Sequence, residues 1–276
     1  MKRGTLTEVG RALAAAAWAG AMFTSSRVMA QVPPAADDAV DYWTRRFEPA
    51  GFPLIGGNSD IGFEFGGAAT LSYFARGVRP YAWNMDLLAS ASLKGGPSGI
   101  ELAQQSYLWQ LDWPGLFGGG VRLGPEAAFS RTINEGYFGL GNASIGAPAP
   151  SSTPNPDRYH EFIENVLLLR SSIRVELRGP FAALFNVEYR YVVPETYAGS
   201  LLASDQRAQA PSGGPVLYAT GPMSLGGLAG GFVYDTRDSE IFTTTGMFHQ
   251  VGFQLVQGAP PSDGVRYGEA GAILAG

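Results

Sequence analysis

The chain has 276 residues, a formal net charge of -5 and no cysteine; 16% of its residues are charged and 12% are aromatic. The absence of cysteine excludes disulfides and thiolate-bound metal, and the acidic balance argues against a nucleic-acid partner. With 38 glycines and 19 prolines, the composition favours strands joined by turns over a helical or disordered chain.

Residues 1–30 have the pattern of a secretory signal peptide. Two basic residues precede an apolar stretch, Ala12–Phe23, that ends near Ala30. This stretch is shorter than the roughly 20 apolar residues that a membrane-spanning helix needs, so we expect cleavage before Gln31 rather than a membrane anchor. Residues 31–50 then form a short periplasmic leader that is too small to be a domain.

From residue 51 to the end, apolar and polar residues alternate in runs separated by turn-forming residues, which is the period-two signal of β-strands. The runs predict ten antiparallel strands: Gly51–Ile55, Ile61–Arg76, Tyr81–Lys94, Gly99–Trp113, Val121–Arg131, Leu167–Arg178, Phe181–Val193, Ser224–Arg237, Met247–Gln257 and Val265–Leu274. In the fourth, the apolar parity changes between Leu102 and Tyr107, which indicates a β-bulge or a different strand boundary.

Three patterns favour a transmembrane β-barrel over a periplasmic sandwich, the alternative all-β fold. Several runs extend for about 12 to 16 residues, whereas soluble strands usually have five or six. Aromatic residues cluster near strand ends, as the girdles of a membrane barrel would require: Phe63/Phe65 beside the aliphatic Ile61, Tyr81/Trp83, Tyr107/Trp109/Trp113 and Tyr189/Tyr191.

Connection lengths give the third pattern. With a first strand at Gly51–Ile55, the turns near Gly77, Pro114, Gly179 and Asp238 all lie on the periplasmic side. The two longest connections, Thr132–Tyr159 and Pro194–Met223, both lie on the other side. Outer-membrane barrels have this asymmetry, with short turns on one side and long loops on the other. We therefore expect residues 51–276 to form an outer-membrane β-barrel.

Charged residues in two neighbouring strands are expected to line a polar lumen. Arg170, Arg174 and Arg178 recur every fourth residue and so share one face of a strand. Glu188 and Arg190 occupy the polar face of the next strand. Cross-strand salt bridges are a second interpretation, and both can hold at once.

Three segments resemble the bacterial surface-antigen family of outer-membrane barrels, which includes the barrels of the barrel-assembly and translocation-assembly proteins. The segments are Gly136–Asn142 (GYFGLGN), Gly231–Asp238 (GFVYDTRD) and Phe242–Gly246 (FTTTG). The resemblance implies structural roles for the residues of these motifs, namely Tyr137, Phe138, Gly139, Gly141, Asn142, Tyr234, Asp235, Arg237, Asp238 and Gly246.

The same resemblance implies a cellular role. It predicts a protein of the outer membrane, with membrane lipid and the envelope assembly machinery as partners, that acts in outer-membrane protein assembly or translocation. Family barrels have sixteen strands, so the ten strands here resemble an incomplete, C-terminally truncated member. The chain also lacks the family's periplasmic repeat domains, because the leader has room for none.

The remaining patterns predict no enzyme. The only two histidines, His160 and His249, lie in different segments without an obvious serine and aspartate partner, and no spacing indicates a metal site or a cofactor. Asp235, Arg237 and Asp238 indicate an ion network or a solvated strand end. Besides the assembly role, two functions stay open: a passive pore lined by Arg170, Arg174, Glu188 and Arg190, and a soluble periplasmic ligand-binding β-protein.

Overall fold

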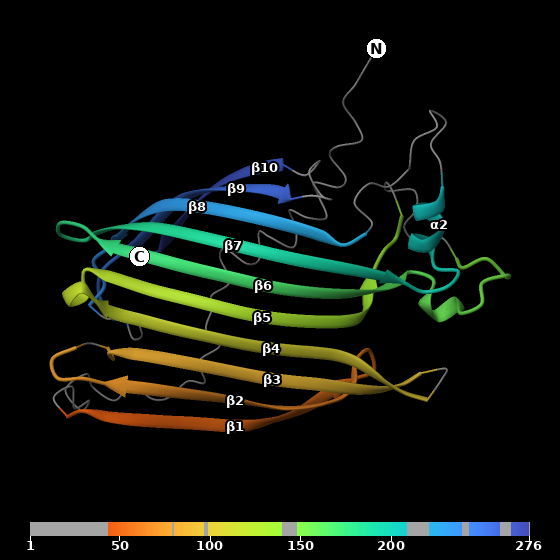
Figure 1. Ribbon diagram of the computed structural model, residues 1–276, viewed down its shortest axis with the longest axis horizontal. Helices are drawn as coiled ribbons and strands as arrows, with labels where there is room; N and C mark the ends of the chain where they lie inside the picture. Colours follow the sequence, from red (N-terminus) through yellow and green to blue (C-terminus); the bar gives the residue numbers. More distant parts are fainter. Residues whose placement is uncertain are drawn as a thin grey trace, which may run out of the picture. The chain divides into compact units, whose positions relative to one another are not determined.

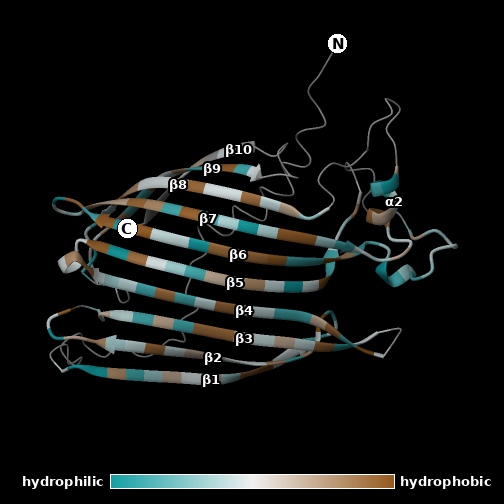
Figure 2. Cartoon of the chain, in the orientation of Figure 1, coloured by the Kyte–Doolittle hydropathy of each residue, from teal (hydrophilic) through white to brown (hydrophobic). Residues whose placement is uncertain are grey.

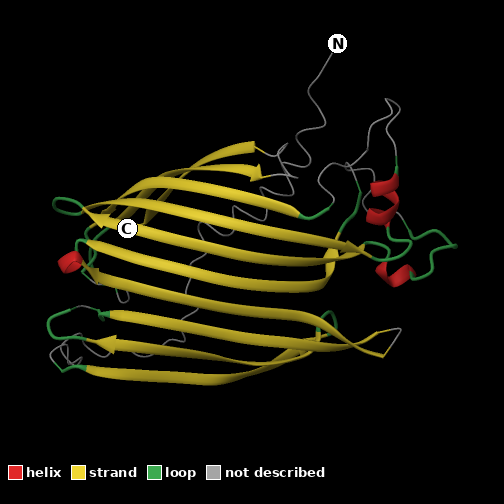
Figure 3. Cartoon of the chain, viewed as in Figure 1, coloured by secondary structure: helices red, strands yellow, loops and turns green. Residues whose placement is uncertain are grey.

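A computed structural model describes residues 44–78, 80–96, 99–139, 148–208, 221–238, 243–259 and 266–275. Within them the chain is all-β: ten strands form one antiparallel sheet in which every strand pairs with its neighbour in sequence (Figures 1 and 3). The strands are β1 (Arg46–Asn58), β2 (Gly62–Phe74), β3 (Trp83–Gly96), β4 (Gly99–Leu116), β5 (Val121–Gly136), β6 (Glu161–Glu176), β7 (Phe181–Thr196), β8 (Met223–Asp235), β9 (Phe248–Ala259) and β10 (Arg266–Ala275). Helix is limited to η2 (Phe117–Gly119), η4 (Pro156–Arg158) and α2 (Leu201–Arg207) in this part of the chain.

All ten predicted strands are confirmed, but β1 and β6 begin five or more residues earlier than predicted. β1 begins at Arg46, so the end of the predicted leader is wrong: residues 46–50 belong to the sheet. Pro49 and Pro53 argued against a longer strand in the sequence, because proline lacks the N–H that a β-ladder uses. β1 lies at the edge of the sheet, where a proline can turn its nitrogen to the unpaired side. β6 begins at Glu161 instead of Leu167, and the predicted signal peptide lies outside the described residues.

The predicted bulge in the fourth strand is confirmed. Ser92 pairs with Gln104 and the next residue, Leu93, pairs with Leu102, so Ala103 is the extra residue on β4. Its side chain is almost completely buried. The bulge explains why apolar residues change parity along β4 while their side chains stay on one face of the sheet.

The sheet is open in the described part of the chain, where the outer strands β1 and β10 each have one neighbour. The sequence predicted the strands of a closed barrel. The structure confirms the strands and their antiparallel order, but β1 and β10 do not pair with each other to close the sheet into a barrel. None of the helices in the described ranges has the length and hydrophobicity needed to cross a membrane.

The two faces of the sheet have opposite chemistry, and Figure 2 shows the alternation along individual strands. We call them the apolar face, which carries Phe63 and Phe65 on β2 and Phe185 and Val187 on β7, and the polar face, which carries the residues between them. On β7, Phe185 and Val187 are each 53% exposed, whereas Glu188 is only 7% exposed. This is the reverse of a soluble protein, in which charged groups are exposed and large apolar groups are buried.

The strand order places the connections as predicted. Residues 75–82, 117–120, 177–180 and 236–247 join strands at one end of the sheet, which we call the turn end. The two longest connections, 137–160 and 197–222, join strands at the other end. The turn predicted at Pro114 lies slightly later, since β4 continues to Leu116. Asp112 is the last β4 residue paired with β3, so Pro114 lies beyond the β3–β4 ladder, where its missing N–H costs no bond to β3.

Two compact units are distinguished within the chain. The larger contains most of the sheet, and the smaller, which we call the loop unit, comprises the described residues of Thr132–Glu164 and Val193–Pro222. In the loop unit, the N–H of Leu201 donates to the carbonyl of Tyr159, and the Ser200 hydroxyl caps α2 by accepting from the N–H of Ala203. The two long connections are therefore folded against each other.

Candidate functional site: the charged polar face

Two ion pairs lie in the middle of the polar face. Arg170 on β6 binds Glu126 on β5 at 2.7 Å, and Arg190 lies 3.4 Å from Glu188 on β7. Glu188 also interacts electrostatically with Arg170 and Glu126, so the four charges form one balanced cluster. Glu188 and Arg190 are less than a tenth exposed. Pairing of this kind is what allows buried charges to persist, because an isolated charge would be far more costly.

A second group of charges lies nearer the turn end. Arg174 binds Glu176 at 2.7 Å and approaches Asp235 at 3.8 Å. Arg237 donates through Nε and Nη2 to the two oxygens of Asp235, at 2.8 and 2.7 Å. Asp235 therefore joins the end of β8 to β6 across the strand between them.

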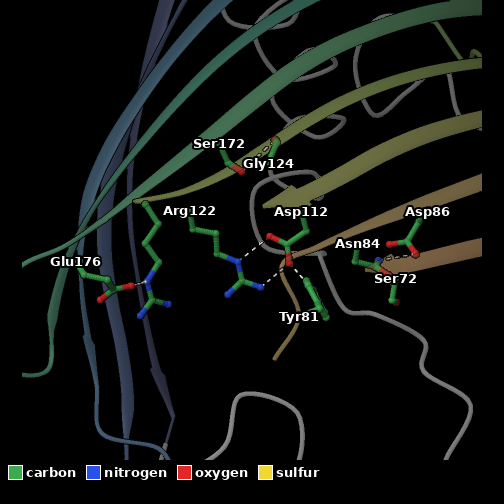
Figure 4. A network of polar contacts seen from close by, with 10 residues as sticks. Ser72, Tyr81, Asn84, Asp86, Asp112, Arg122, Gly124, Ser172 and Glu176 are labelled. Atoms are coloured by element: carbon green, nitrogen blue, oxygen red, sulfur yellow. Dashed lines mark hydrogen bonds and ion pairs between the residues drawn. The ribbon is translucent and has the colours of Figure 1, made fainter. Parts of the chain in front are cut away.

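A third network, on β3 to β5, was not predicted from the sequence. Arg122 donates to both oxygens of Asp112 at 2.7 Å, and the hydroxyl of Tyr81 donates to the same carboxylate (Figure 4). Asn84, paired with Asp112 across the strands, accepts from Thr70 and Ser72 and donates to Asp86. The prediction that Tyr81 belongs to an aromatic girdle is wrong, since Tyr81 precedes β3 and is buried on the polar face.

The structure brings together four of the five residues that were expected to share a charged surface. Arg170, Arg174, Glu188 and Arg190 all take part in ion pairs on the polar face. Arg178 does not join them, because β6 ends at Glu176 and Arg178 lies exposed in the turn. The sequence analysis missed three residues of this face: Asp112, Arg122 and Glu126. A usable signal was present, because each is a charged residue at a polar position of an alternating strand segment.

The second and third family-like motifs meet in a single turn between β8 and β9. Asp238 accepts hydrogen bonds from the N–H groups of Thr244 and Thr245 at 2.9 and 3.1 Å, and from the Thr244 hydroxyl. These bonds, the hydroxyl first, hold the pKa of Asp238 well below its usual range. The carboxylate therefore stays charged at neutral pH, and the turn loses this support only as the pH falls through that lowered pKa.

Gly246 closes the same turn. Its φ is +107°, and a Cβ there would overlap the carbonyl oxygen of Thr236. Thr236 in turn donates its N–H to the carbonyl of Met247 at 2.9 Å, which aligns the two strand ends. The structural role implied for Asp238 and Gly246 thus has a physical basis in this turn.

Replacing Gly246 by alanine should lower the free energy of unfolding by about 1–3 kcal/mol, because the new Cβ meets backbone and the φ is strained for any L side chain. Gly95→Ala is the matched control, since a Cβ there has no neighbour within 4 Å. Chemical denaturation of both variants measures the difference. Equal stability of the two would contradict the structure of this turn.

The first family-like motif lies in the loop unit. The hydroxyl of Tyr137 donates to Asp205 at 2.8 Å, and the ring of Phe138 stacks on His160 with centroids 5.2 Å apart. Burial raises the pKa of Tyr137, and the Asp205 carboxylate raises it further, so the phenol keeps the proton that this bond needs. Gly139 ends this described stretch, and Gly141 and Asn142 lie outside the described residues.

Arg158 is the buried centre of the loop unit. It is 7% exposed, donates to the Tyr197 hydroxyl at 2.6 Å and to the carbonyl of Ile133 at 3.3 Å, and lies 4.6 Å from the centroid of the Tyr197 ring. One guanidinium therefore ties η4 to both the end of β5 and the start of the second long connection.

Arg158→Met should release this connection. Loss of charged hydrogen bonds of this kind costs about 2 kcal/mol, which raises the open population and thus the protease cleavage rate by roughly tenfold or more. Limited proteolysis of the loop unit provides the measurement, with exposed Asp157→Asn beside it as the control. Unchanged cleavage of Arg158→Met would show that Arg158 does not hold the loops.

The two histidines lie in different parts of the described structure. Nδ1 of His160 is 3.2 Å from the carbonyl of Tyr137, and His249 stacks on Tyr234 with centroids 6.0 Å apart. Within the described ranges, no group of three or more metal-ligating side chains is present. No protein-family model and no curated protein matches this sequence. What the described side chains form is a sheet with one charged face and one apolar face.

Proposed function

We propose that this protein is an integral outer-membrane protein, and that its sheet is part of the wall of a β-barrel with the polar face toward an aqueous lumen. The observation that carries the proposal is the reversed burial of the two faces. In the described part of the chain, 28 large apolar residues are exposed, while Asp112, Glu188 and Arg190 are buried.

An apolar face of this extent is hard to reconcile with water. Soluble monomers rarely expose apolar patches larger than a few hundred Å², and each Å² of apolar surface in water costs roughly 25 cal/mol relative to burial. Exposed large apolar residues occur on β1 to β4 and on β6 to β9, and on β5 between them the half-buried ring of Phe129 stacks on Tyr107 of β4. Hydrocarbon removes this cost without any second protein layer.

Aromatic residues lie near both ends of two strands on the apolar face. Phe63 and Tyr73 are ten residues apart near the ends of β2, and Phe181 and Tyr191 are ten residues apart near the ends of β7. At about 3.3 Å per residue, the interval is about 33 Å along a strand. A strand tilt of about 40° reduces it to about 25 Å across the membrane, which is the height of the apolar band in outer-membrane barrels.

At the turn end, the aromatic level is a contiguous ladder. The ring of Tyr73 lies 4.7 Å from Phe47 on β1 and 5.9 Å from Trp83 on β3, measured between centroids. Such rings favour the headgroup region, where their faces contact lipid and their polar atoms reach water.

The free edges of β1 and β10 support a larger barrel. Unpaired backbone N–H and C=O groups cost several kcal/mol each in hydrocarbon, so an open sheet in a membrane must pair its edges. We infer that further strands, or a second copy, complete the circle. The sixteen-stranded surface-antigen barrel is the form that the motif resemblance suggests.

An assembly or translocation role rests on that resemblance and on the turn between β8 and β9. Two separate motifs close this turn through Asp238 and Gly246, which gives their sequences a common structural purpose. The envelope assembly machinery is the partner that this role implies.

A passive pore is the second candidate, and the buried polar face favours it. The Oε1 atom of Gln254 on β9 is buried without a hydrogen-bond partner. Buried polar atoms are normally satisfied by protein or water, and a water-filled lumen would supply the missing bonds.

Fractionation of cells that express the full-length protein tests the proposal. We expect recovery in the outer-membrane fraction, resistance to extraction by carbonate, and a shift in electrophoretic mobility on heating that is typical of barrels. Recovery in the aqueous periplasmic fraction would contradict it and favour a soluble β-protein. In planar bilayers, stable currents would favour the pore over an assembly role.

A further inference from the structure

We propose that Arg45, Arg76 and Arg178, at the turn end of the sheet, bind the phosphate groups of anionic phospholipids. The inference rests on the membrane placement proposed above and adds to it a partner of defined chemistry, a lipid with a negatively charged headgroup such as phosphatidylglycerol. It depends on where the three arginines lie relative to the aromatic rings of the apolar face and to the acidic side chains of the same end.

Rings on neighbouring strands lie at the border of the apolar face at the turn end. Besides the ladder around Tyr73, a second ladder crosses β7 to β9. In it, Tyr234 lies opposite Phe181 and His249, with ring centroids 5.3 and 6.0 Å away. Aromatic rings that carry a polar atom favour the boundary between hydrocarbon and headgroups. The two ladders therefore indicate the depth at which the headgroup layer begins.

Each arginine lies just beyond one of these rings. Arg45 is two residues before Phe47 and has the same parity, Arg76 is three residues after Tyr73, and Arg178 is three residues before the ring that begins β7; all three arginines are exposed. Two or three residues span at most about 7–10 Å of chain, or about 5–8 Å along the membrane normal at a strand tilt of about 40°. The headgroup layer on each side of a bilayer is about 5–7 Å thick, so these guanidinium groups lie at the level of the phosphates.

Short turns hold two of the arginines at this depth. In the β6–β7 connection, the N–H of Leu177 donates to the carbonyl of the first β7 residue at 2.8 Å, so Arg178 lies within a closed turn. Arg76 lies in a β-turn in which the N–H of Val78 donates to the carbonyl of Ala75 at 3.1 Å. Both connections are at the left of Figure 1. Hydrogen-bonded turns of this kind keep the guanidinium groups from following the strands toward the hydrocarbon.

The acidic side chains of the turn end lie elsewhere, mostly on the polar face with partners of their own. Asp86 is on that face and accepts from Asn84 at 2.9 Å, and Asp238 is bound within its turn by the N–H groups of Thr244 and Thr245. The other four form ion pairs on the polar face: Glu48 with Arg46, Asp112 with Arg122, Glu176 with Arg174, and Asp235 with Arg237. Among the described residues of this end, three arginines and one carboxylate, Asp238, therefore lie off the polar face.

Arginine suits a phosphate ligand in this position. Its planar guanidinium stays charged and can donate two parallel hydrogen bonds to a phosphate. Attraction of a single arginine to an anionic membrane surface corresponds to about a fivefold gain in association, and salt screens it. A phospholipid also places its acyl chains on the adjoining apolar face, which a free phosphate ion cannot do.

The test uses the full-length protein reconstituted into phosphatidylcholine vesicles that contain a trace of spin-labelled phosphatidylglycerol. The motionally restricted fraction of the label, compared with that of spin-labelled phosphatidylcholine, gives the relative association constant at the protein surface. We expect a preference for phosphatidylglycerol that falls by at least about twofold when Arg45, Arg76 and Arg178 are all replaced by glutamine. Arg207→Gln, which removes an exposed arginine of the loop unit, is the control and should leave the preference unchanged.

The outcomes separate this inference from the membrane placement. An inserted triple variant with an unchanged preference would overturn the inference and leave the placement intact, as would an equal loss of preference in Arg207→Gln. If the triple variant does not insert, the wild-type protein still decides, because a preference that persists in 1 M NaCl is not electrostatic and would also overturn the inference. Failure of the wild-type protein to enter vesicles would overturn the placement and the inference together.

Discussion

Under the proposed membrane placement, arginine in place of Val187 should destabilise the protein by about 2–4 kcal/mol, the cost of a charge on the lipid-facing side of a barrel strand near mid-bilayer. Val187 lies in the middle of β7 and is 53% exposed on the apolar face. Its neighbours Phe185 and Tyr189 share that face, so no polar group is available to receive the guanidinium. Reversible unfolding in lipid vesicles measures the change.

Asn186→Arg is the matched control. Asn186 is adjacent in sequence and similar in depth, and its side chain lies on the polar face, where a guanidinium can be hydrated. We expect it to cost less than about 1 kcal/mol, as for a solvated surface charge. Equal effects at the two positions would mean that both faces meet the same surroundings, which would contradict the assignment of the apolar face to lipid.

Asp112→Ala is expected to have the second-largest effect, about 2–4 kcal/mol of stability, because it removes the common partner of Arg122 and Tyr81. Asp112 is 7% exposed, and loss of one member of a buried pair leaves the other charge uncompensated. Arg122 is 23% exposed on its side chain, so water reduces the cost below that of a fully buried pair. Thermal unfolding in detergent gives the comparison.

Two further variants show whether the network is the cause. The double variant Asp112→Ala with Arg122→Ala should recover part of the loss, because no unpaired charge remains. Glu176→Gln, at a pair whose acidic side chain is 42% exposed, should cost less than about 1 kcal/mol. The pairing would be contradicted if the double variant lost more stability than the two single variants, Asp112→Ala and Arg122→Ala, lose when their losses are added.

The strands were predictable because period-two alternation persists over the whole length of each strand. On β7, apolar side chains at Phe185, Val187 and Tyr189 alternate with Asn186 and Glu188 without interruption, so the face on which each side chain lies followed from the sequence alone. The alternation fails as a guide where one residue is inserted, as at Ala103, or where prolines occupy an edge strand, as at Pro49 and Pro53. In both places the pairing with a neighbour decides the structure.

The charged face was only half predictable. Parity identified which residues share a face, and that sufficed for Arg170, Arg174, Glu188 and Arg190. Parity does not identify the ion-pair partners of these residues, because the register between two strands decides which residues lie opposite each other. Glu126 is 44 residues from Arg170 in sequence, and Tyr81 reaches Asp112 from a connection where strand parity no longer applies.

The loop unit was beyond prediction for a different reason. Its contacts join residues from two long connections, such as Tyr137 with Asp205 and Arg158 with Tyr197. No periodicity governs such loops, and burial of Arg158 depends on the fold of both connections together. The sequence indicated only that these loops are long.

Spin labels on alternate residues of β7 test the central claim most directly. Since the chain has no cysteine, single cysteines at residues 184 to 189 can each be labelled in the full-length protein reconstituted into vesicles. Collision with oxygen should be high at 185, 187 and 189, collision with a water-soluble nickel complex should be high at 184, 186 and 188, and the two profiles should alternate out of phase. Labels at 185, 187 and 189 that are immobilised and shielded from both reagents would place this face inside a protein core and contradict the account.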